Sequence, residues 1–137
     1  MAKSIREVMT TDVRACEPNV AVTDAAKLMA KEDVGPIPIV EEGRLVGLIT
    51  DRDIVVRVIA EGKDPKLTKV GQIATKDLVN VSPDADLDEA LKLMAERQVR
   101  RLPVVEGERL IGIVAQADVA RMGKDKKTGE VVEEISR

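Results

Sequence analysis

The sequence contains no phenylalanine, tyrosine, tryptophan or histidine, and only one of its 137 residues is a cysteine. Without histidine or a second cysteine it cannot form a Cys/His zinc site, a histidine-ligated haem, or a Ser-His-Asp or Cys-His catalytic arrangement. Without aromatic rings it has no stacking platform for single-stranded nucleic acid and no aromatic cage for a quaternary cation. A purine would therefore have to be held between aliphatic side chains.

A dominant charge and long apolar runs are also missing. The 22 basic and 25 acidic residues give a net charge of −3 and are interspersed, which does not favour nucleic-acid binding. No apolar run approaches the roughly 20 residues of a bilayer-spanning helix, and the N-terminus lacks the apolar centre of a signal peptide. With the single Cys16 and no internal disulfide, we expect a cytoplasmic protein that does not bind membranes.

The sequence is nevertheless rich in aliphatic residues, and it is internally repeated. Hydrophobic residues make up 44% of the chain, enough for a substantial core. Residues 10–53 align without gaps to residues 75–118, and 16 of these 44 positions are identical. That period is too long for a solenoid and indicates a tandem duplication. We expect repeats at 4–62 and 70–122, a linker at 63–69 and a charged tail at 123–137.

Each repeat shows the same order of expected elements. A short amphipathic start, with the capping-box pattern of Ser4 and Glu7, precedes a strand, an amphipathic helix, two strands joined by a glycine turn, and a second helix. This β-α-β-β-α order, together with the duplication, predicts one α/β or α+β sandwich that folds into a pseudo-symmetric body. The expected strands are 13–16, 37–40 and 45–50, then 78–81, 102–105 and 110–115.

The most informative local segment runs from Gly47 to Asp53. Gly47 would allow another group to approach the strand closely, and Thr50 and Asp53 would meet where the second helix starts. A carboxylate there could accept hydrogen bonds from both hydroxyls of a ribose. The Thr-x-x-Asp spacing is also close to a capping box, so both side chains could serve only their own helix. The second repeat keeps the aspartate as Asp118 but has Ala115 in place of the threonine.

Two arginines, Arg100 and Arg101, directly precede an expected strand of the second repeat. Guanidinium groups bind phosphate in a fork geometry, although solvation or surface ion pairing also explains either arginine. Cys16 aligns with Val81 and is expected in the core rather than as a nucleophile. No carboxylate pair stands out as an acid–base couple, so we expect no enzyme activity.

Taken together, these features resemble the CBS domain, a family normally found as tandem pairs. The resemblance covers residues 4–122 and rests on two ordered copies of the same pattern. The pattern comprises a proline before the first helix, a hydrophobic-Pro-hydrophobic-Val strand, and a Gly-h-h-Thr-x-x-Asp segment before the second helix. The chain looks most like the small stand-alone CBS-pair proteins of bacteria and archaea. That resemblance implies that the two copies pack as one pseudo-two-fold module with two clefts, each joining the Thr-x-x-Asp segment of one copy to the first and second strands of the other.

The resemblance also implies ligands and site residues. The expected ligands contain adenosine: AMP, ADP, ATP or S-adenosylmethionine, with no cofactor required. The aspartate would bind the ribose hydroxyls and basic residues would bind phosphate. By position, cleft A would use Thr50, Arg52, Asp53, Val79, Val81, Arg100 and Arg101, and cleft B would use Arg14, Cys16, Gly35, Pro36, Ala115 and Asp118.

Cleft B departs from the family pattern because it lacks the threonine hydroxyl and the paired arginines. The resemblance further implies a homodimer formed through helices, for which the apolar face of the second helix (Ile54, Val55, Val58 and Ile59) is a candidate, although packing in the core explains this face nearly as well. We therefore expect a regulatory module that senses energy or metabolites by binding an adenosine nucleotide and acts on an unknown effector protein. The alternative is a structural or interaction module whose clefts are vestigial.

Overall fold

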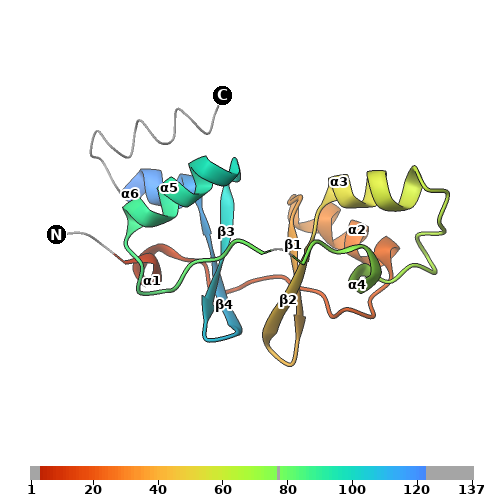
Figure 1. Cartoon of the computed structure of the whole chain (residues 1–137), viewed down its shortest axis with the longest axis horizontal. Helices are drawn as coiled ribbons and strands as arrows, with labels where there is room; N and C mark the ends of the chain where they lie inside the picture. Colours follow the sequence, from red (N-terminus) through yellow and green to blue (C-terminus); the bar gives the residue numbers. More distant parts are fainter. Residues whose placement is uncertain (1–3, 77, 123–137) are drawn as a thin grey trace. The chain divides into compact units, whose positions relative to one another are not determined.

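A computed structural model describes residues 4–76 and 78–122 (Figure 1). The chain divides into two compact units that do not coincide with the sequence repeats. The first, here called the continuous unit, is Arg14–Leu78. The second, the split unit, combines Met1–Val13 with Val79–Arg137. Each unit thus holds most of one repeat together with the short segment that begins the other. We call these the lead-in segments: residues 4–13 for the first repeat and 70–78 for the second. The tail expected at 123–137 lies outside the described residues.

The continuous unit is built around one β-hairpin. Strands β1 and β2 pair antiparallel, and α2 contacts α3 while α4 contacts β2 (Figure 1). The hairpin turn is Glu42-Gly43, where both residues have positive φ, at 54° and 82°. This is the backbone that a two-residue turn between twisted strands requires. The elements are α2 (Val22–Glu32), β1 (Ile37–Glu41), β2 (Arg44–Ile49), α3 (Asp51–Ile54), η1 (Val55–Ile59) and α4 (Val70–Ile73).

The second helix of this unit changes its hydrogen-bond spacing partway along. It begins as α3, but the amide of Ala60 donates to the carbonyl of Val55, and Lys63 donates to Val58. These bonds span five residues, so η1 is a wider, π-helical turn. The helix gives way to Gly62, whose φ of +70° suits a glycine.

The split unit repeats this plan with its own hairpin, β3–β4, as an antiparallel pair. Its short helix α1 occupies the same position as α4 does in the continuous unit, because the Ile5 amide donates to Ala85 and the equivalent Val70 amide donates to Val20. The expected α+β class and its internal repetition are therefore confirmed. The elements are α1 (Ile5–Val8), α5 (Leu87–Arg97), β3 (Arg101–Glu106), β4 (Arg109–Ala115) and α6 (Gln116–Met122).

Each unit has its own aliphatic core, which one face of the long helix and the inner face of the hairpin supply. In the continuous unit Ile37, Ile39 and Ile49 are at most 1% exposed. The matched methionines Met29 and Met94 are buried in their respective cores. Burying one such aliphatic side chain contributes roughly 1.5–3 kcal/mol, so a compact unit needs no aromatic residue.

Two local expectations were wrong. The segments 13–16 and 78–81 are not strands: only Cys16 and Val81 pair, through single parallel bridges to Ile39 and Val104. Each makes two backbone hydrogen bonds with its neighbouring strand before the chain turns at the following proline, which cannot donate to a ladder. The Ser4 side chain makes no capping hydrogen bond to α1, so the capping-box pattern there is not realised.

Candidate functional site

Thr50 and Asp53 cap α3 reciprocally. The Thr50 hydroxyl Oγ1 accepts a hydrogen bond from the Asp53 amide at 3.0 Å, and Asp53 Oδ2 accepts one from the Thr50 amide at 2.9 Å. This is a complete capping box, and it satisfies two amides that the helix leaves without partners. The capping interpretation of the Thr-x-x-Asp spacing is thus confirmed.

The capping box leaves one oxygen of Asp53 without a hydrogen-bond donor among the described residues. Oδ1 lies 3.9 Å from Nε of Arg57, which is close enough for ionic attraction but too long for a hydrogen bond. The Asp53 side chain is only 12% exposed, so Oδ1 is a shielded acceptor beside a positive charge. Such an oxygen can still accept a hydroxyl hydrogen from a ligand.

Arg57 was missed at the sequence level. Its Nη1 donates to the Ile73 carbonyl at the end of α4, at 3.0 Å, so its guanidinium is held between Asp53 and the lead-in segment of the second repeat. The signal that could have revealed it is spacing, because Arg57 follows Asp53 by four residues and i, i+4 side chains are neighbours on a helix.

The close approach expected at Gly47 is made by the chain itself. A Cβ added at Gly47 would lie 3.2 Å from Cβ of Ala74, and Leu48 exchanges two backbone hydrogen bonds with Thr75. Gly112 is in the equivalent situation, 2.8 Å from the Thr10 carbonyl by the same measure. Gly47 therefore makes room for the lead-in segment of the second repeat, which crosses β2. We expected Gly47 to let another group approach the strand, and the group that does so is the chain itself.

The residues expected in cleft A come from both units. Thr50, Arg52 and Asp53 belong to the continuous unit, and Arg52 is exposed. Val79, Val81, Arg100 and Arg101 belong to the split unit, where Val81 is buried and both arginines are exposed. The grouping of these two sets into one cleft stays a prediction.

Within the split unit, Arg100 and Arg101 lie beside the second repeat's own Ala115 segment. Arg101 is the register partner of Ala115 across β3 and β4, and the Gln116 amide donates to the Arg100 carbonyl at 2.7 Å. The paired arginines thus lie beside the segment of the second repeat that has Ala115 in place of the threonine. From the sequence they were expected only in the cleft that contains Thr50.

The residues expected in cleft B are also drawn from both units. In the continuous unit, Arg14 forms an ion pair with Glu32 at 2.8 Å, and Gly35 and Pro36 precede β1. In the split unit, Asp118 pairs with Arg121, and Ala115 ends β4. Cleft B itself therefore also stays a prediction.

Cys16, the remaining expected residue of cleft B, is 6% exposed. Burial raises the pKa of its thiol above the ordinary value, and the charge of Asp24 raises it further. A thiol held in its neutral form is a weak nucleophile. The expectation that Cys16 is a core residue is thus confirmed.

The apolar face of the second helix divides into buried and exposed parts. Val58 is fully buried and Ile54 packs against the same core. Val55 and Ile59 are each 58% exposed, and Val56 is 46% exposed. We call Val55, Val56 and Ile59 the exposed helix patch.

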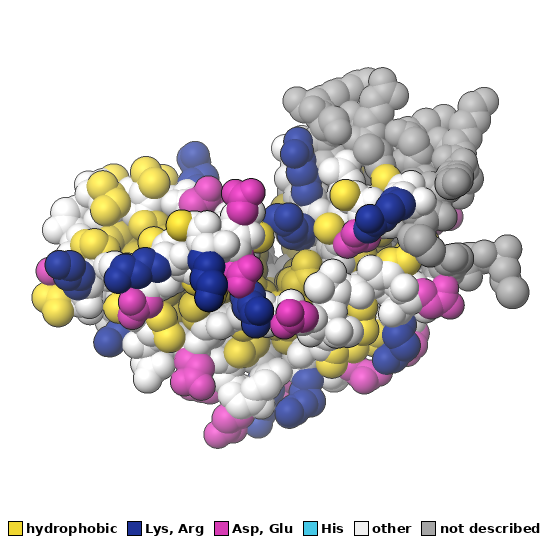
Figure 2. Space-filling model, turned by 180° about the vertical axis from the view of Figure 1, so that it is seen from behind, with side chains coloured by type: hydrophobic (Ala, Val, Ile, Leu, Met, Phe, Trp, Pro, Cys, Tyr) yellow, Lys and Arg dark blue, Asp and Glu magenta, His cyan; other side chains and the backbone are white. Residues whose placement is uncertain are grey.

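Several classes of site receive no support from the described part of the chain. Among residues 4–76 and 78–122, no group of three or more histidine, cysteine, aspartate or glutamate side chains could hold a metal ion. Over the same residues, none of the helices is long and apolar enough to cross a bilayer. Basic and acidic side chains are interspersed on the face drawn in Figure 2.

Fold and site together define a duplicated α+β module in which each repeat places an aspartate at the equivalent position, Asp53 or Asp118, in the first turn of its second helix. Matches to the CBS domain at residues 5–60 and 70–125 cover most of the sequence. The chain belongs to the CBS domain family.

Individual relatives support this assignment. The CBS domain-containing protein YhcV of Bacillus subtilis is 44% identical over 117 residues, covering 85% of this chain and 83% of that protein. The crystal structure of Hypoxic Response Protein I with two coordinated zinc ions matches with a TM-score of 0.80 at 38% identity, covering 88% and 99% of the two chains. The CBS domain pair of protein MJ0100, in complex with 5-methylthioadenosine and S-adenosyl-L-methionine, matches with a TM-score of 0.76 at 27% identity, covering 89% and 96%.

Proposed function

We propose that this chain is a non-catalytic regulatory module that binds an adenosine-containing nucleotide through Asp53 and Thr50. The observation that carries the proposal is Asp53 Oδ1, a shielded carboxylate oxygen without a hydrogen-bond donor among the described residues. It matches the need of a ribose, whose hydroxyls donate hydrogen bonds. The MJ0100 pair, a structural relative, binds two adenosine-containing molecules.

The remaining roles in the proposal follow from chemistry. Arg52, Arg100 and Arg101 supply charge for phosphate, and the partly buried Val79 supplies apolar contact for the base, whereas the side chain of Val81 belongs to the core beneath it. AMP, ADP, ATP and S-adenosylmethionine are the ligands to test first. A ligand regulates only when it favours one of two states. In this proposal, the two states differ in how they act on a separate effector protein in the cytoplasm. The exposed helix patch provides the contact for a homodimer.

A purine held without aromatic stacking depends more heavily on its ribose and phosphate contacts. Removing the ribose acceptor is therefore the sharpest test. Asp53→Asn keeps an oxygen that can cap α3 but removes the charge and replaces one acceptor with a donor. We expect it to weaken adenosine-nucleotide binding by at least about tenfold, which corresponds to roughly 1.4 kcal/mol, in calorimetric titrations.

The matched control is Asp33→Asn, which removes the same charge elsewhere in the continuous unit. Asp33 is the C-cap of α2 with φ of 54°, a left-handed conformation that asparagine tolerates. Equal affinities of the wild-type protein and Asp53→Asn would reject the role of Asp53. Absence of any heat with the whole nucleotide series would reject the sensor function.

A second function is favoured by one specific observation. Thr50 and Asp53 already satisfy each other in the capping box, so these side chains have a structural role without any ligand. In this alternative the chain is a structural or protein-interaction module with vestigial clefts. It predicts that Asp53→Asn changes neither nucleotide binding nor dimer formation, whereas changes to the exposed helix patch do alter assembly.

A further inference from the structure

The two units differ at one equivalent position of their short helices. The Arg6 amide donates to the Pro83 carbonyl at 3.0 Å, and the Gly71 amide donates to the Pro18 carbonyl at 2.9 Å. Because Pro83 and Pro18 are matched residues of the two repeats, Arg6 and Gly71 occupy the same place in their units. One carries a long cationic side chain and the other carries none.

In the split unit this position provides a guanidinium to two carboxylates. Arg6 Nη2 donates to Glu106 Oε2 at 2.9 Å and contacts Asp84 Oδ1 at 3.5 Å. Glu106 ends β3, and Asp84 follows Pro83 in the turn before α5. The hydrogen bond to Glu106 is the largest cause that raises the pKa of Arg6 above its ordinary value.

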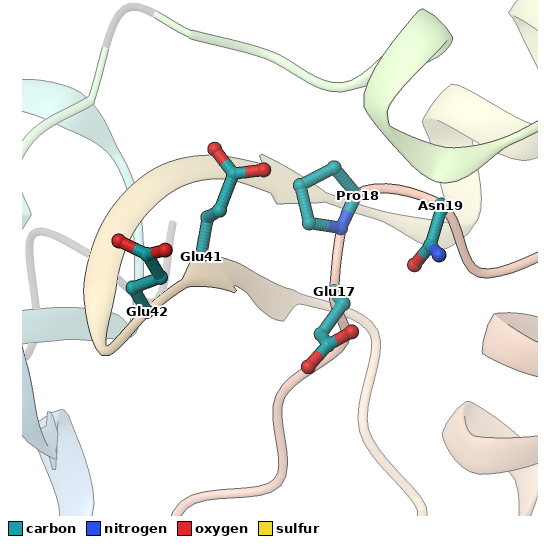
Figure 3. Close-up of a pocket in the computed structure, with 5 residues that line it drawn as sticks. All are labelled: Glu17, Pro18, Asn19, Glu41 and Glu42. Atoms are coloured by element: carbon teal, nitrogen blue, oxygen red, sulfur yellow. The ribbon is translucent and has the colours of Figure 1, made fainter.

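In the continuous unit the equivalent place is a pocket. It has a volume of about 300 Å³ and lies between the Pro18 turn and the end of the β1–β2 hairpin (Figure 3). Glu41 is the counterpart of Glu106, and Asn19 is the counterpart of Asp84. The lining residues are Glu17, Pro18, Asn19, Glu41 and Glu42.

Two of the acidic side chains that line the pocket, Glu17 and Glu41, have no partner within the described part of the chain. In residues 4–76 and 78–122, no hydrogen bond or ion pair engages the side chain of Glu17 or Glu41, and both are exposed. The Asn19 side chain supplies a neutral oxygen where the split unit has the Asp84 carboxylate. Glu17 adds a negative charge at a position that is Ser82 in the other repeat.

We propose that this pocket binds a guanidinium group supplied from outside this chain, either an arginine side chain of a partner polypeptide or a free alkylguanidine. The independent observation behind it is the other repeat, where residues at the same positions ligate the guanidinium of Arg6. The site is separate from Thr50 and Asp53, because the hairpin turn and Thr50 lie at opposite ends of β2. It therefore does not depend on nucleotide binding.

A guanidinium is the group to test because the matched group of the split unit is one: Nη2 of Arg6 contacts both carboxylates. An ammonium is a compact point charge without the planar set of donors that a guanidinium has. An exposed ion pair of this kind is individually weak, so we expect a dissociation constant on the order of millimolar for a small guanidine. A partner that adds contacts around the arginine would bind more tightly.

The test is an NMR titration of the ¹⁵N-labelled full chain with ethylguanidinium. We expect saturable shifts of the amides of Asn19, Glu41 and Gly71, and none with N-ethylurea, its neutral analogue. Glu41→Gln should weaken binding at least about fivefold, whereas the control Asp33→Asn should not. Gly71→Arg should abolish binding by filling the pocket, although its Cβ would press on Pro18 at 3.0 Å.

Arg6→Ala provides the positive control, because it opens the matched site beside Glu106. Ethylguanidinium should then shift the amides of Asp84 and Glu106. If the Arg6→Ala site responds while the wild-type pocket does not, the proposal is overturned. It is equally overturned if N-ethylurea produces the same shifts or if Glu41→Gln binds as well as wild type.

A final comparison identifies the source of the guanidinium. A capped Ala-Arg-Ala peptide that binds more tightly than ethylguanidinium supports a partner's side chain as the occupant. Equal binding of the peptide and the small guanidine supports a free alkylguanidine.

Discussion

Arg57 connects the carboxylate of Asp53 to the lead-in segment of the second repeat. Its Nε lies 3.9 Å from Asp53 Oδ1, and its Nη1 donates to the Ile73 carbonyl at 3.0 Å. Arg57→Ala should therefore lower the free energy of unfolding by about 1 kcal/mol, mostly through the lost hydrogen bond, since the half-exposed ion pair is screened by solvent. Urea denaturation measures this loss. Arg52→Ala, at an exposed neighbouring position, should change stability by less than about 0.5 kcal/mol, and equal effects would contradict the bridging role.

The capping box can be tested separately from ligand binding. Thr50→Ala removes the hydroxyl that accepts from the Asp53 amide, and loss of such a cap costs about 1 kcal/mol. Thr50→Ser keeps an acceptor and should recover most of that stability. Thermal and chemical denaturation of the two variants give the comparison, and an unchanged Thr50→Ala protein would show that the cap does not stabilise the unit.

Alanine substitutions at Gly112 and Gly47 should destabilise the protein to different degrees, because the lead-in segments pass these two glycines at different distances. A methyl group at Gly112 would lie 2.8 Å from the Thr10 carbonyl and 2.9 Å from Met9 Sδ, whereas one at Gly47 would meet Cβ of Ala74 at 3.2 Å. We expect Gly112→Ala to destabilise the protein by roughly 1–3 kcal/mol through overpacking, and Gly47→Ala by less. The reverse order in urea denaturation would rule out this account of the glycines.

The thiol of Cys16 should give stability a pH dependence. Because burial and Asp24 raise its pKa in the folded protein, the folded state retains the proton at pH values where the unfolded thiol loses it. Stability is then full below the ordinary thiol pKa and falls as the pH rises through and above it. Cys16→Val, which installs the residue found at the matched position 81, should remove this fall. A fall of the same size in that variant would assign it to other groups.

The exposed helix patch should control self-association. Val55 and Ile59 are each 58% exposed on the second helix, and burying them against a second copy would remove apolar surface from water. Ile59→Glu should shift the proposed dimer towards monomer in analytical ultracentrifugation. Leu67→Glu changes another exposed residue, 77% accessible, outside this helix and serves as the control. A dimer that tolerates Ile59→Glu must use another surface.

The repeat made most of the fold predictable from sequence. Both hairpins lie within about one residue of their expected positions, because short continuous aliphatic runs and glycine turns are local signals. The segments around Cys16 and Val81 were overpredicted as strands, since local propensity does not reveal that each pairs at a single bridge. The capping box at Thr50 was one of two readings that the spacing allowed.

The parts of the site that sequence could not supply depend on contacts between distant segments. Gly47 carries the same sequence signal whether a ligand or the chain itself crosses the strand, and only the fold shows Ala74 there. The pocket beside Glu41 can be proposed as a guanidinium site only when the surroundings of Gly71 are compared with those of Arg6 in three dimensions. Alignment pairs those two residues, but it does not show that Arg6 reaches Glu106, which follows it by one hundred residues.

The exchange of lead-in segments also fixes an order of events during synthesis. The continuous unit, Arg14–Leu78, is complete as soon as its last residue has left the ribosome, and domains generally fold as units during translation. Helix α1 is synthesised before the continuous unit, yet the residues it packs against, such as Ala85, are synthesised after it. The apolar side chain of Ile5 therefore stays uncovered while the continuous unit folds.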